Sequence, residues 1–416
     1  FKKYNTSGMF YAHASVGTLH VRPVLNMKSD VDIKNMKSIS QEAFEMVKNY
    51  KGSHSGEHGD GIVRSEFHEM MFGKKIINAF EEIKDTFDNK NLLNPGKIVR
   101  PYKSNDRSLM RYKSGYHANN INTHYDWSNW GQFSDAVEMC NNNGACRKLD
   151  SGVMCPSYRV TKEEKDLVRG RANTLRLALS NQLPEGSFAS KDMYETMELC
   201  VSCKACQREC PMSVDMAKMK SEFLSHYYKK FSMPIKDRVI SNMPRLIWLL
   251  KIIAPTFNKV KNLPLISTIV NKFGFATERE MPEVQSQDAL KEIYNSQPVS
   301  ENKVILFADT FNINFENKNL IYSIKVINKF GYQAIIPSYG KDNLSRPLCC
   351  GRTYISYGQL DKAALELNRF NDYILENNYY DLPVVGIEPS CLLTFNDEYL
   401  SLKNVNNREK IKNKFY

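Results

Sequence analysis

Residues 200–211 read CVSCKACQRECP. Four cysteines in this stretch precede a proline with the spacing C-x2-C-x2-C-x3-C-P, namely Cys200, Cys203, Cys206 and Cys210. In such a motif, three thiolates on a tight loop bind one iron–sulfur cubane, and the fourth ligates the other cluster of a two-cluster ferredoxin. Zinc sites instead pair C-x2-C units across a wide gap. The stretch therefore predicts an electron-transfer module with at least one 4Fe-4S cluster.

A second, incomplete copy of the motif lies upstream, at Cys140, Cys146 and Cys155 followed by a proline. Asn143 occupies the place of the missing cysteine. If the two copies exchange their last cysteines, Cys155 completes the cluster of the intact motif. Cys140, Cys146 and Cys210 then lack one ligand. That site is open to three interpretations: a three-iron cluster, a cubane with a non-cysteine ligand, or no cluster.

A third cysteine group falls in residues 301–416, where short apolar runs alternate with helical patterns. This strand–helix–strand order predicts a parallel α/β domain, with strands near 304–308, 334–337 and 382–387. Cys349 and Cys350 precede a glycine, and Cys391 follows the last expected strand. Ligands of parallel sheets lie beyond the carboxyl ends of the strands. The three thiols are therefore a redox or cluster site, or else inert buried cysteines.

Composition narrows the class of protein. The ten cysteines fall in three groups, which indicates metal or redox chemistry in a reducing, cytoplasmic compartment. The net charge of +11 is spread along the chain without a dense basic block, so we expect no nucleic-acid partner. No apolar run is long enough to span a bilayer. The basic, apolar residues 240–275 leave open a peripheral association with the inner membrane or with a partner.

Residues 1–100 contain a histidine–carboxylate constellation in the segments HASVGTLH (13–20) and SGEHGDG (55–61). Two histidines and one carboxylate form a common divalent-metal set that leaves positions open for a substrate. His58 directly follows Glu57 and is placed to accept a proton. His20 and Arg22 share one face of an expected strand because side chains alternate. The competing interpretation is that these are structural or surface side chains.

The remaining chain divides into further segments. A helical repeat spans residues 72–87, and a polar, aperiodic stretch over 101–135 predicts a linker. Residues 136–300 are expected to form a helical ferredoxin-type domain. Within it, Thr161 and Glu164 form a capping-box pattern that predicts a helix running to about Leu179. The fold class is therefore α+β and multidomain.

Together these segments resemble the flavin-linked D-2-hydroxyacid dehydrogenases, in the form that fuses a flavin oxidase to iron–sulfur and CCG-type domains. Residues 1–100 look like the C-terminal cap and tail of the oxidase, which also carries LLNPGKI (92–98). Residues 136–215 look like its ferredoxin-type segment, and residues 301–416 look like a truncated CCG domain. The flavin-binding domain of this family is expected before residue 1.

The resemblance implies a role for each residue of the constellation. His13, His20 and Glu57 would ligate a divalent metal, zinc or manganese, and His58 would take the hydroxyl proton of the substrate. Asn94 would lie near FAD, the hydride acceptor. Arg22 stands where relatives commonly have asparagine, and it could clamp a substrate carboxylate.

The implied reaction is oxidation of a D-2-hydroxyacid, with D-2-hydroxyglutarate giving 2-oxoglutarate. Electrons would leave through the cluster to a quinone or an electron-transfer protein. A rival hypothesis is an iron–sulfur electron-transfer subunit, of the glycolate-oxidase or heterodisulfide-reductase kind, without a substrate site. Another is a basic, zinc-stabilised nucleic-acid protein, which leaves the Cys-Pro pairing unexplained. The oligomeric state stays open.

Overall fold

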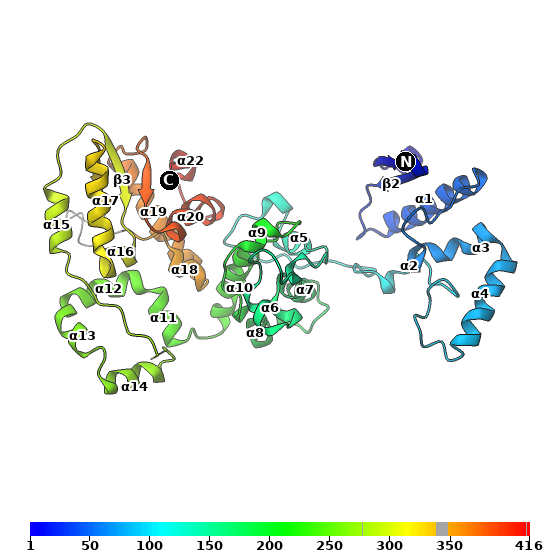
Figure 1. Cartoon of the computed structure of the whole chain (residues 1–416), viewed down its shortest axis with the longest axis horizontal. Helices are drawn as coiled ribbons and strands as arrows, with labels where there is room; N and C mark the ends of the chain where they lie inside the picture. Colours follow the sequence, from blue (N-terminus) through cyan, green and yellow to red (C-terminus); the bar gives the residue numbers. More distant parts are fainter. Residues whose placement is uncertain (277, 338–347, 413) are drawn as a thin grey trace. The chain divides into compact units, whose positions relative to one another are not determined.

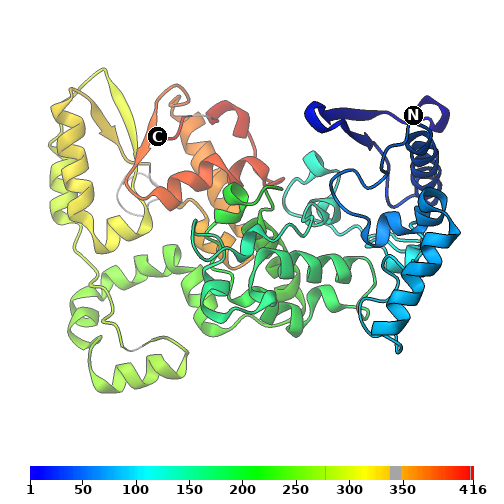
Figure 2. The same ribbon diagram turned by 45° about the vertical axis from the view of Figure 1, so that its right-hand side comes forward.

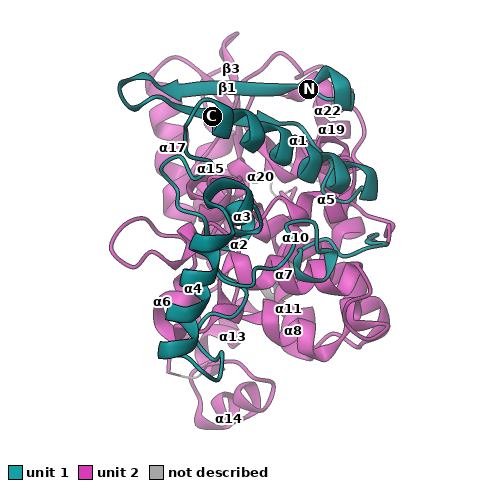
Figure 3. Cartoon of the chain, turned by 90° about the vertical axis from the view of Figure 1, so that its right-hand side faces the viewer, with its two compact units in different colours: residues 1–117 teal, residues 118–416 magenta. Residues whose placement is uncertain are grey.

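The structure, a computed structural model, describes residues 1–276, 278–337, 348–412 and 414–416, without the side chains of 248–252. The chain forms two compact units, residues 1–117 and residues 118–416 (Figure 3). The division falls inside the expected linker of 101–135. In the second unit, Tyr125, Trp127 and Phe133 are almost completely buried. This part of the expected linker therefore contributes aromatic side chains to a core, although most of its other residues are exposed or half-buried.

The first unit combines a two-stranded antiparallel ribbon with helices. Its strands are β1 (Gly8–His13) and β2 (Thr18–Pro23), and its helices are α1 (Asp30–Asn49), α2 (Gly61–Arg64), α3 (His68–Phe72) and α4 (Lys74–Phe87). The Ser29 hydroxyl caps α1 by accepting from the Asp32 amide. The helix predicted over 72–87 begins at Lys74, since Gly73 takes a φ of 80° and separates α3 from α4.

The second unit begins with a helical half that contains the two upstream cysteine groups. Its helices are α5 (Phe133–Glu138), α6 (Pro156–Thr161), α7 (Val168–Leu179), α8 (Lys191–Glu198), α9 (Ala205–Glu209) and α10 (Met216–Lys230). The capping-box prediction is wrong. Thr161 ends α6, and its hydroxyl donates to the Asp166 carboxylate, so α7 begins only at Val168.

A run of helices follows, α11 (Ile235–Ser241), α12 (Met243–Ile252), α13 (Ala254–Val260), α14 (Pro264–Lys272) and α15 (Asp288–Asn295) (Figure 1). Pro264 occupies the first turn of α14, where its missing N–H costs no hydrogen bond. Of the helices in the described part of the chain, none is both long and apolar enough to cross a membrane.

The C-terminal part is a three-layer α/β structure, as predicted. Its strands are β3 (Lys303–Phe307), β4 (Gln333–Ile335) and β5 (Val384–Gly386), all parallel in the order β4-β3-β5. Its helices are α16 (Thr310–Phe315), α17 (Asn317–Lys329), α18 (Arg352–Ser356), α19 (Leu360–Glu376), α20 (Pro389–Asn396), α21 (Glu398–Ser401) and α22 (Arg408–Ile411). Leu306 packs with the α15–α17 layer, whereas Ile305 and Phe307 pack with α19 and α20. Figure 2 shows α15 and α17 on one side of the sheet and α19 and α20 on the other. Burial on both faces explains the uninterrupted apolar run of β3.

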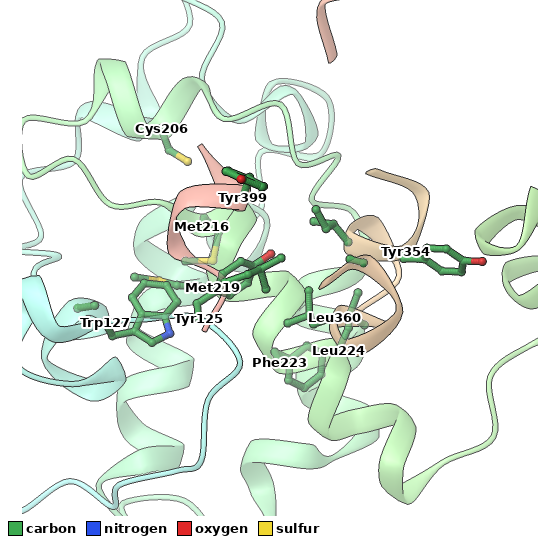
Figure 4. Close-up of a cluster of buried hydrophobic side chains, with 14 of the residues drawn as sticks. Tyr125, Trp127, Cys206, Met216, Met219, Phe223, Leu224, Tyr354, Leu360 and Tyr399 are labelled. Atoms are coloured by element: carbon green, nitrogen blue, oxygen red, sulfur yellow. The ribbon is translucent and has the colours of Figure 1, made fainter. Parts of the chain in front are cut away.

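The helical half and the α/β part share one hydrophobic core within the second unit. Figure 4 shows Tyr125 and Trp127 beside Met219, and Leu224 of α10 beside Leu360 of α19. The boundary expected at residue 300 therefore separates two types of secondary structure, but it does not separate two independent cores.

Candidate metal and iron–sulfur sites

The β1–β2 ribbon places the first two histidines on one face. Tyr11 pairs with His20 across the ribbon, and His13 pairs with Thr18, so both histidines fall on the same side of the pleat. The Tyr11 and His20 rings stack at 4.2 Å with an interplanar angle of 10°. The Arg22 guanidinium lies 4.9 Å from the centre of the Tyr11 ring. Tyr11 thus holds both His20 and Arg22 in place.

Glu57 joins this face from the loop that precedes α2. Its Oε1 atom lies 3.3 Å from His13 Nε2, 3.2 Å from His20 Nε2 and 3.3 Å from His58 Nε2. The His20 side chain is only 11% exposed, while those of His13 and His58 are about half exposed, at 50% and 55%. One carboxylate oxygen is therefore surrounded by three imidazoles and remains accessible from outside the unit.

The residues of this cluster fit a divalent ion. The ligand atoms of His13, His20 and Glu57 lie within 4.8 Å of one another. Tetrahedral zinc with bonds of about 2.0–2.1 Å separates neighbouring ligands by about 3.3 Å, close to the distances from Glu57 to both histidines. His20 Nε2 is buried and makes no hydrogen bond within the described residues. A bound ion would satisfy that nitrogen.

Asn94 is exposed and takes a left-handed φ of 48° before Pro95. Its Oδ1 accepts a long 3.4 Å hydrogen bond from Lys97 Nζ. The amide therefore has capacity for a further partner, and its contact with FAD stays a prediction.

The structure also brings together three residues that the sequence patterns did not single out as a set. His54, Asp60 and His68 form a second group with ligand atoms within 4.8 Å of one another. Asp60 belongs to the SGEHGDG segment, but the two histidines flank it without any periodic pattern. A cue available from sequence was the concentration of histidines in this stretch, which holds His54, His58 and His68.

In the second unit, four cysteines line one small hollow: Cys155, Cys200, Cys203 and Cys206. These are the residues that the exchange of last cysteines groups together. Cys155 takes a φ of 55°, which turns the chain into α6, and its Sγ accepts from the Val168 amide at 3.3 Å. Burial raises the pKa of Cys155 and of Cys206 to about 12. Buried thiolates need a compensating positive charge, which the iron of a cluster provides, so this donor set fits a cubane.

Three cysteines of the first two groups, Cys140, Cys146 and Cys210, are not among those that line this hollow. Cys146 is buried in a 3-10 helix (Ala145–Arg147) that contacts α9, and Cys210 follows the end of α9. Burial is the main cause that raises the pKa of Cys146, and neighbouring Cys140 adds to it. The side-chain Nδ2 of Asn143 donates to Asn141 Oδ1, and its Oδ1 accepts from the backbone amide of Ala145. Asn143 thus stabilises its own turn, and the existence of a second cluster stays a prediction.

The third cysteine group is buried within the α/β part. Cys350 Sγ lies 3.2 Å from Cys391 Sγ, a thiol–thiol hydrogen bond and not a disulfide. The Gly351 amide donates to Cys349 Sγ at 3.3 Å. Gly351 takes a φ of 77°, and an added Cβ would meet Ala363 of α19 at 3.2 Å. A glycine is therefore needed directly after the paired cysteines.

Two family models match the chain, and they fall on the two parts that hold these sites. Residues 1–98 match the FAD linked oxidases, C-terminal domain, and residues 136–214 match the 4Fe-4S dicluster domain. The chain therefore combines a region similar to the C-terminal domain of FAD-linked oxidases with a region similar to 4Fe-4S dicluster domains. Neither match reaches residues 301–416, so the CCG-type assignment stays a prediction.

Particular relatives agree with this combination. The D-2-hydroxyglutarate dehydrogenase of Pantoea ananatis is 28% identical over 94% of this chain and 42% of its own length. That of Escherichia coli is 25% identical over the same shares. Glycolate oxidase subunit GlcD of Bacillus subtilis is 32% identical over 23% of this chain and 20% of its own length. The resemblance to the flavin-linked D-2-hydroxyacid dehydrogenases is confirmed, although the chain spans about two fifths of the length of the first two relatives. No solved structure matches.

Proposed function

We propose that this chain is part of an FAD- and 4Fe-4S-dependent dehydrogenase that oxidises D-2-hydroxyglutarate to 2-oxoglutarate. The observation that carries the proposal is the convergence of three imidazoles on Glu57 Oε1. It occurs in a chain that aligns over nearly its whole length with D-2-hydroxyglutarate dehydrogenases. The rival electron-transfer subunit would have no use for this arrangement.

Oxidation of a 2-hydroxyacid removes a proton from the hydroxyl group and a hydride from C2. When bound, FAD would supply the hydride acceptor, a divalent ion would polarise the hydroxyl group, and a cluster would conduct the electrons onward. Within this chain, His13, His20 and Glu57 would hold the ion. His58 is the general base, because its Nε2 lies next to this ligand set and its side chain is open to an entering substrate.

Arg22 confers preference for a dicarboxylic substrate in this proposal. It is exposed on the same ribbon face as His20, and its guanidinium is oriented by the Tyr11 ring. A planar guanidinium donates two parallel hydrogen bonds to a carboxylate. Arg22 therefore binds a carboxylate of D-2-hydroxyglutarate while the hydroxyl group lies toward His58.

A 4Fe-4S cluster, which would supply one-electron transfer, would be held by Cys155, Cys200, Cys203 and Cys206. The acceptor is a quinone or an electron-transfer protein on the cytoplasmic side of the inner membrane. The exposed apolar side chains of α14 support a peripheral contact there, since Leu265 and Ile269 lie one helical turn apart among exposed positions. Cys349, Cys350 and Cys391 form a second redox or cluster site in this proposal.

The test is turnover by the native protein that contains this chain, with D- and L-2-hydroxyglutarate, D-lactate and glycolate as substrates and an artificial acceptor. Oxidation of D-2-hydroxyglutarate is expected, together with its loss in Glu57→Gln. Glu82→Gln, at an exposed position of α4, is the matched control and should keep full activity. Unchanged turnover in Glu57→Gln would contradict the assignment of the site.

A further inference from the structure

His54, Asp60 and His68 form a compact group inside the first unit. His68 Nε2 lies 2.9 Å from Asp60 Oδ2, and His54 Nε2 lies 3.5 Å from Asp60 Oδ1. The His54 and His68 side chains are 0% and 3% exposed, and that of Asp60 is 19% exposed. Two imidazoles are thus removed from water on either side of one carboxylate.

The contacts within this group are close but do not have the geometry of hydrogen bonds. Both ring nitrogens of His54 and of His68, together with Asp60 Oδ1, are buried without a hydrogen-bond partner among the described residues. Burying a polar atom without a partner costs about 1–3 kcal/mol. Several such atoms in one place indicate that something else satisfies them.

The distances match those between ligands of one metal ion. Tetrahedral zinc separates neighbouring ligand atoms by about 3.3 Å. His68 Nε2 lies 2.9 Å from one Asp60 oxygen and His54 Nε2 lies 3.5 Å from the other, and one ligand atom of each residue lies within 4.8 Å of the other two. Imidazole nitrogens and carboxylate oxygens are also the kinds of ligand that zinc binds.

Aromatic side chains surround the two histidines of this group. The Phe44 ring meets His54 edge-on at 5.2 Å, and the Phe72 ring lies 5.4 Å from His68. Aromatic walls exclude water and strengthen electrostatic interactions inside. The partly exposed Asp60 side chain leaves a path by which an ion and one water molecule can enter.

We propose that His54, Asp60 and His68 bind a second divalent transition-metal ion, zinc by the nature of the ligands, separate from the ion at His13, His20 and Glu57. Three protein ligands and a water molecule complete the coordination. The inference stands on its own geometry and does not depend on the proposed substrate or on the first ion.

An ion at this site would stabilise the conformation of the loop that carries Glu57 and His58. His54 precedes the SGEHGDG segment, Asp60 lies within it, and His68 begins α3. An ion that joins the three would fix both ends of the loop that carries Glu57 and His58. The second ion would therefore stabilise the position of Glu57 in the site formed by His13, His20 and Glu57, and it would not contact the substrate.

The experiment is elemental analysis of non-iron divalent metals, per chain, on the native protein purified anaerobically and supplied with zinc. The wild type is expected to retain two equivalents after brief chelation. His68→Gln and His20→Asn should each retain one equivalent, and the double variant should retain none. His117→Gln, a substitution at an exposed histidine outside both groups, is the matched control and should retain two.

The wild-type count decides the inference even where His68→Gln unfolds the first unit and loses both ions. A single equivalent in the wild type that disappears entirely in His20→Asn would overturn the second site. One equivalent that survives in His20→Asn and is lost in His20→Asn/Asp60→Asn would establish the second site even if the first does not bind zinc.

Discussion

His20 Nε2 lies 3.2 Å from Glu57 Oε1, although the first residue belongs to a strand and the second to the loop before α2. The strand pairing places the His20 ring against the Tyr11 ring, and the loop before α2 places the Glu57 carboxylate next to His20. The arrangement therefore depends on tertiary structure. In the proposed function, His13, His20 and Glu57 would hold the ion and His58 would accept the proton, and substitutions can distinguish the two roles.

Substitution of His20 and of His58 should affect different quantities. His20→Asn removes a ligand and should lower both the metal content and the activity. His58→Gln should keep the metal and lower kcat by about 10²–10⁴-fold, the usual contribution of a general base. Metal analysis in parallel with steady-state kinetics checks both. Loss of the metal in His58→Gln would place His58 among the ligands instead.

Arg22→Lys should weaken the binding of a dicarboxylate selectively. Lysine keeps the charge but loses the paired hydrogen bonds, so KM for D-2-hydroxyglutarate should rise by about tenfold, equivalent to about 1.4 kcal/mol. The KM for D-lactate, which has one carboxylate, should change much less if that carboxylate binds elsewhere. An equal rise for both substrates would assign Arg22 to the carboxylate that they share.

Cys155→Ala should damage the cluster of the intact motif, although Cys155 is distant from that motif in sequence. Cys155 lines the same hollow as Cys200, Cys203 and Cys206. The iron bound per chain should fall by up to about four, and the EPR signal of the reduced cubane should be lost or altered. Cys210→Ala is the comparison variant and should leave that signal in place. The opposite result would show that each motif keeps its own last cysteine.

The stability of the second unit should depend on pH through His124 and Glu222. His124 Nδ1 lies 3.1 Å from Glu222 Oε1, and this hydrogen bond raises the pKa of His124 above its usual 6.5. Burial alone would raise the pKa of Glu222. Hydrogen bonds from the His124 ring and from the His124 and Tyr125 amides, together with the nearby His226 ring, outweigh it and lower that pKa to about 2.

Glu222 is therefore ionised throughout the neutral range, and of this hydrogen-bonded pair His124 is the partner that changes its charge there. Its contribution is complete below about pH 6.5 and is lost as the pH rises through the higher pKa of the folded state. The free energy of unfolding should therefore fall as the pH rises from about 6 to about 9. Urea titrations followed by circular dichroism measure it. His124→Gln should flatten this dependence, and an equally steep profile in that variant would contradict the assignment.

The sequence predicted the sheet well because its signals are local. Val304, Ile305 and Leu306 are apolar on both sides of the strand, which is typical of a central strand covered on both faces. The cysteine spacing likewise predicted which thiols share the hollow. The class of protein followed from motifs that lie on single loops.

Features that depend on distant contacts were missed. The segment over 118–135 is polar in composition, but Tyr125 and Trp127 bury themselves against α10. Thr161 was expected to begin a helix, but its hydroxyl donates to the Asp166 carboxylate, and the next long helix begins only at Val168. The sequence shows that histidines are concentrated around His54 and His68, but no periodic pattern pairs these two, and the fold of the first unit brings them to Asp60.

The most direct test of the account is the EPR spectrum of the native protein mixed anaerobically with D-2-hydroxyglutarate. We expect the signal of a reduced 4Fe-4S cluster to appear in the wild type, because in the proposed function the electrons from substrate oxidation would be transferred to the cluster. Glu57→Gln should give this signal with dithionite but not with the substrate. A wild-type protein whose cluster is reduced by dithionite and never by D-2-hydroxyglutarate would contradict the central claim.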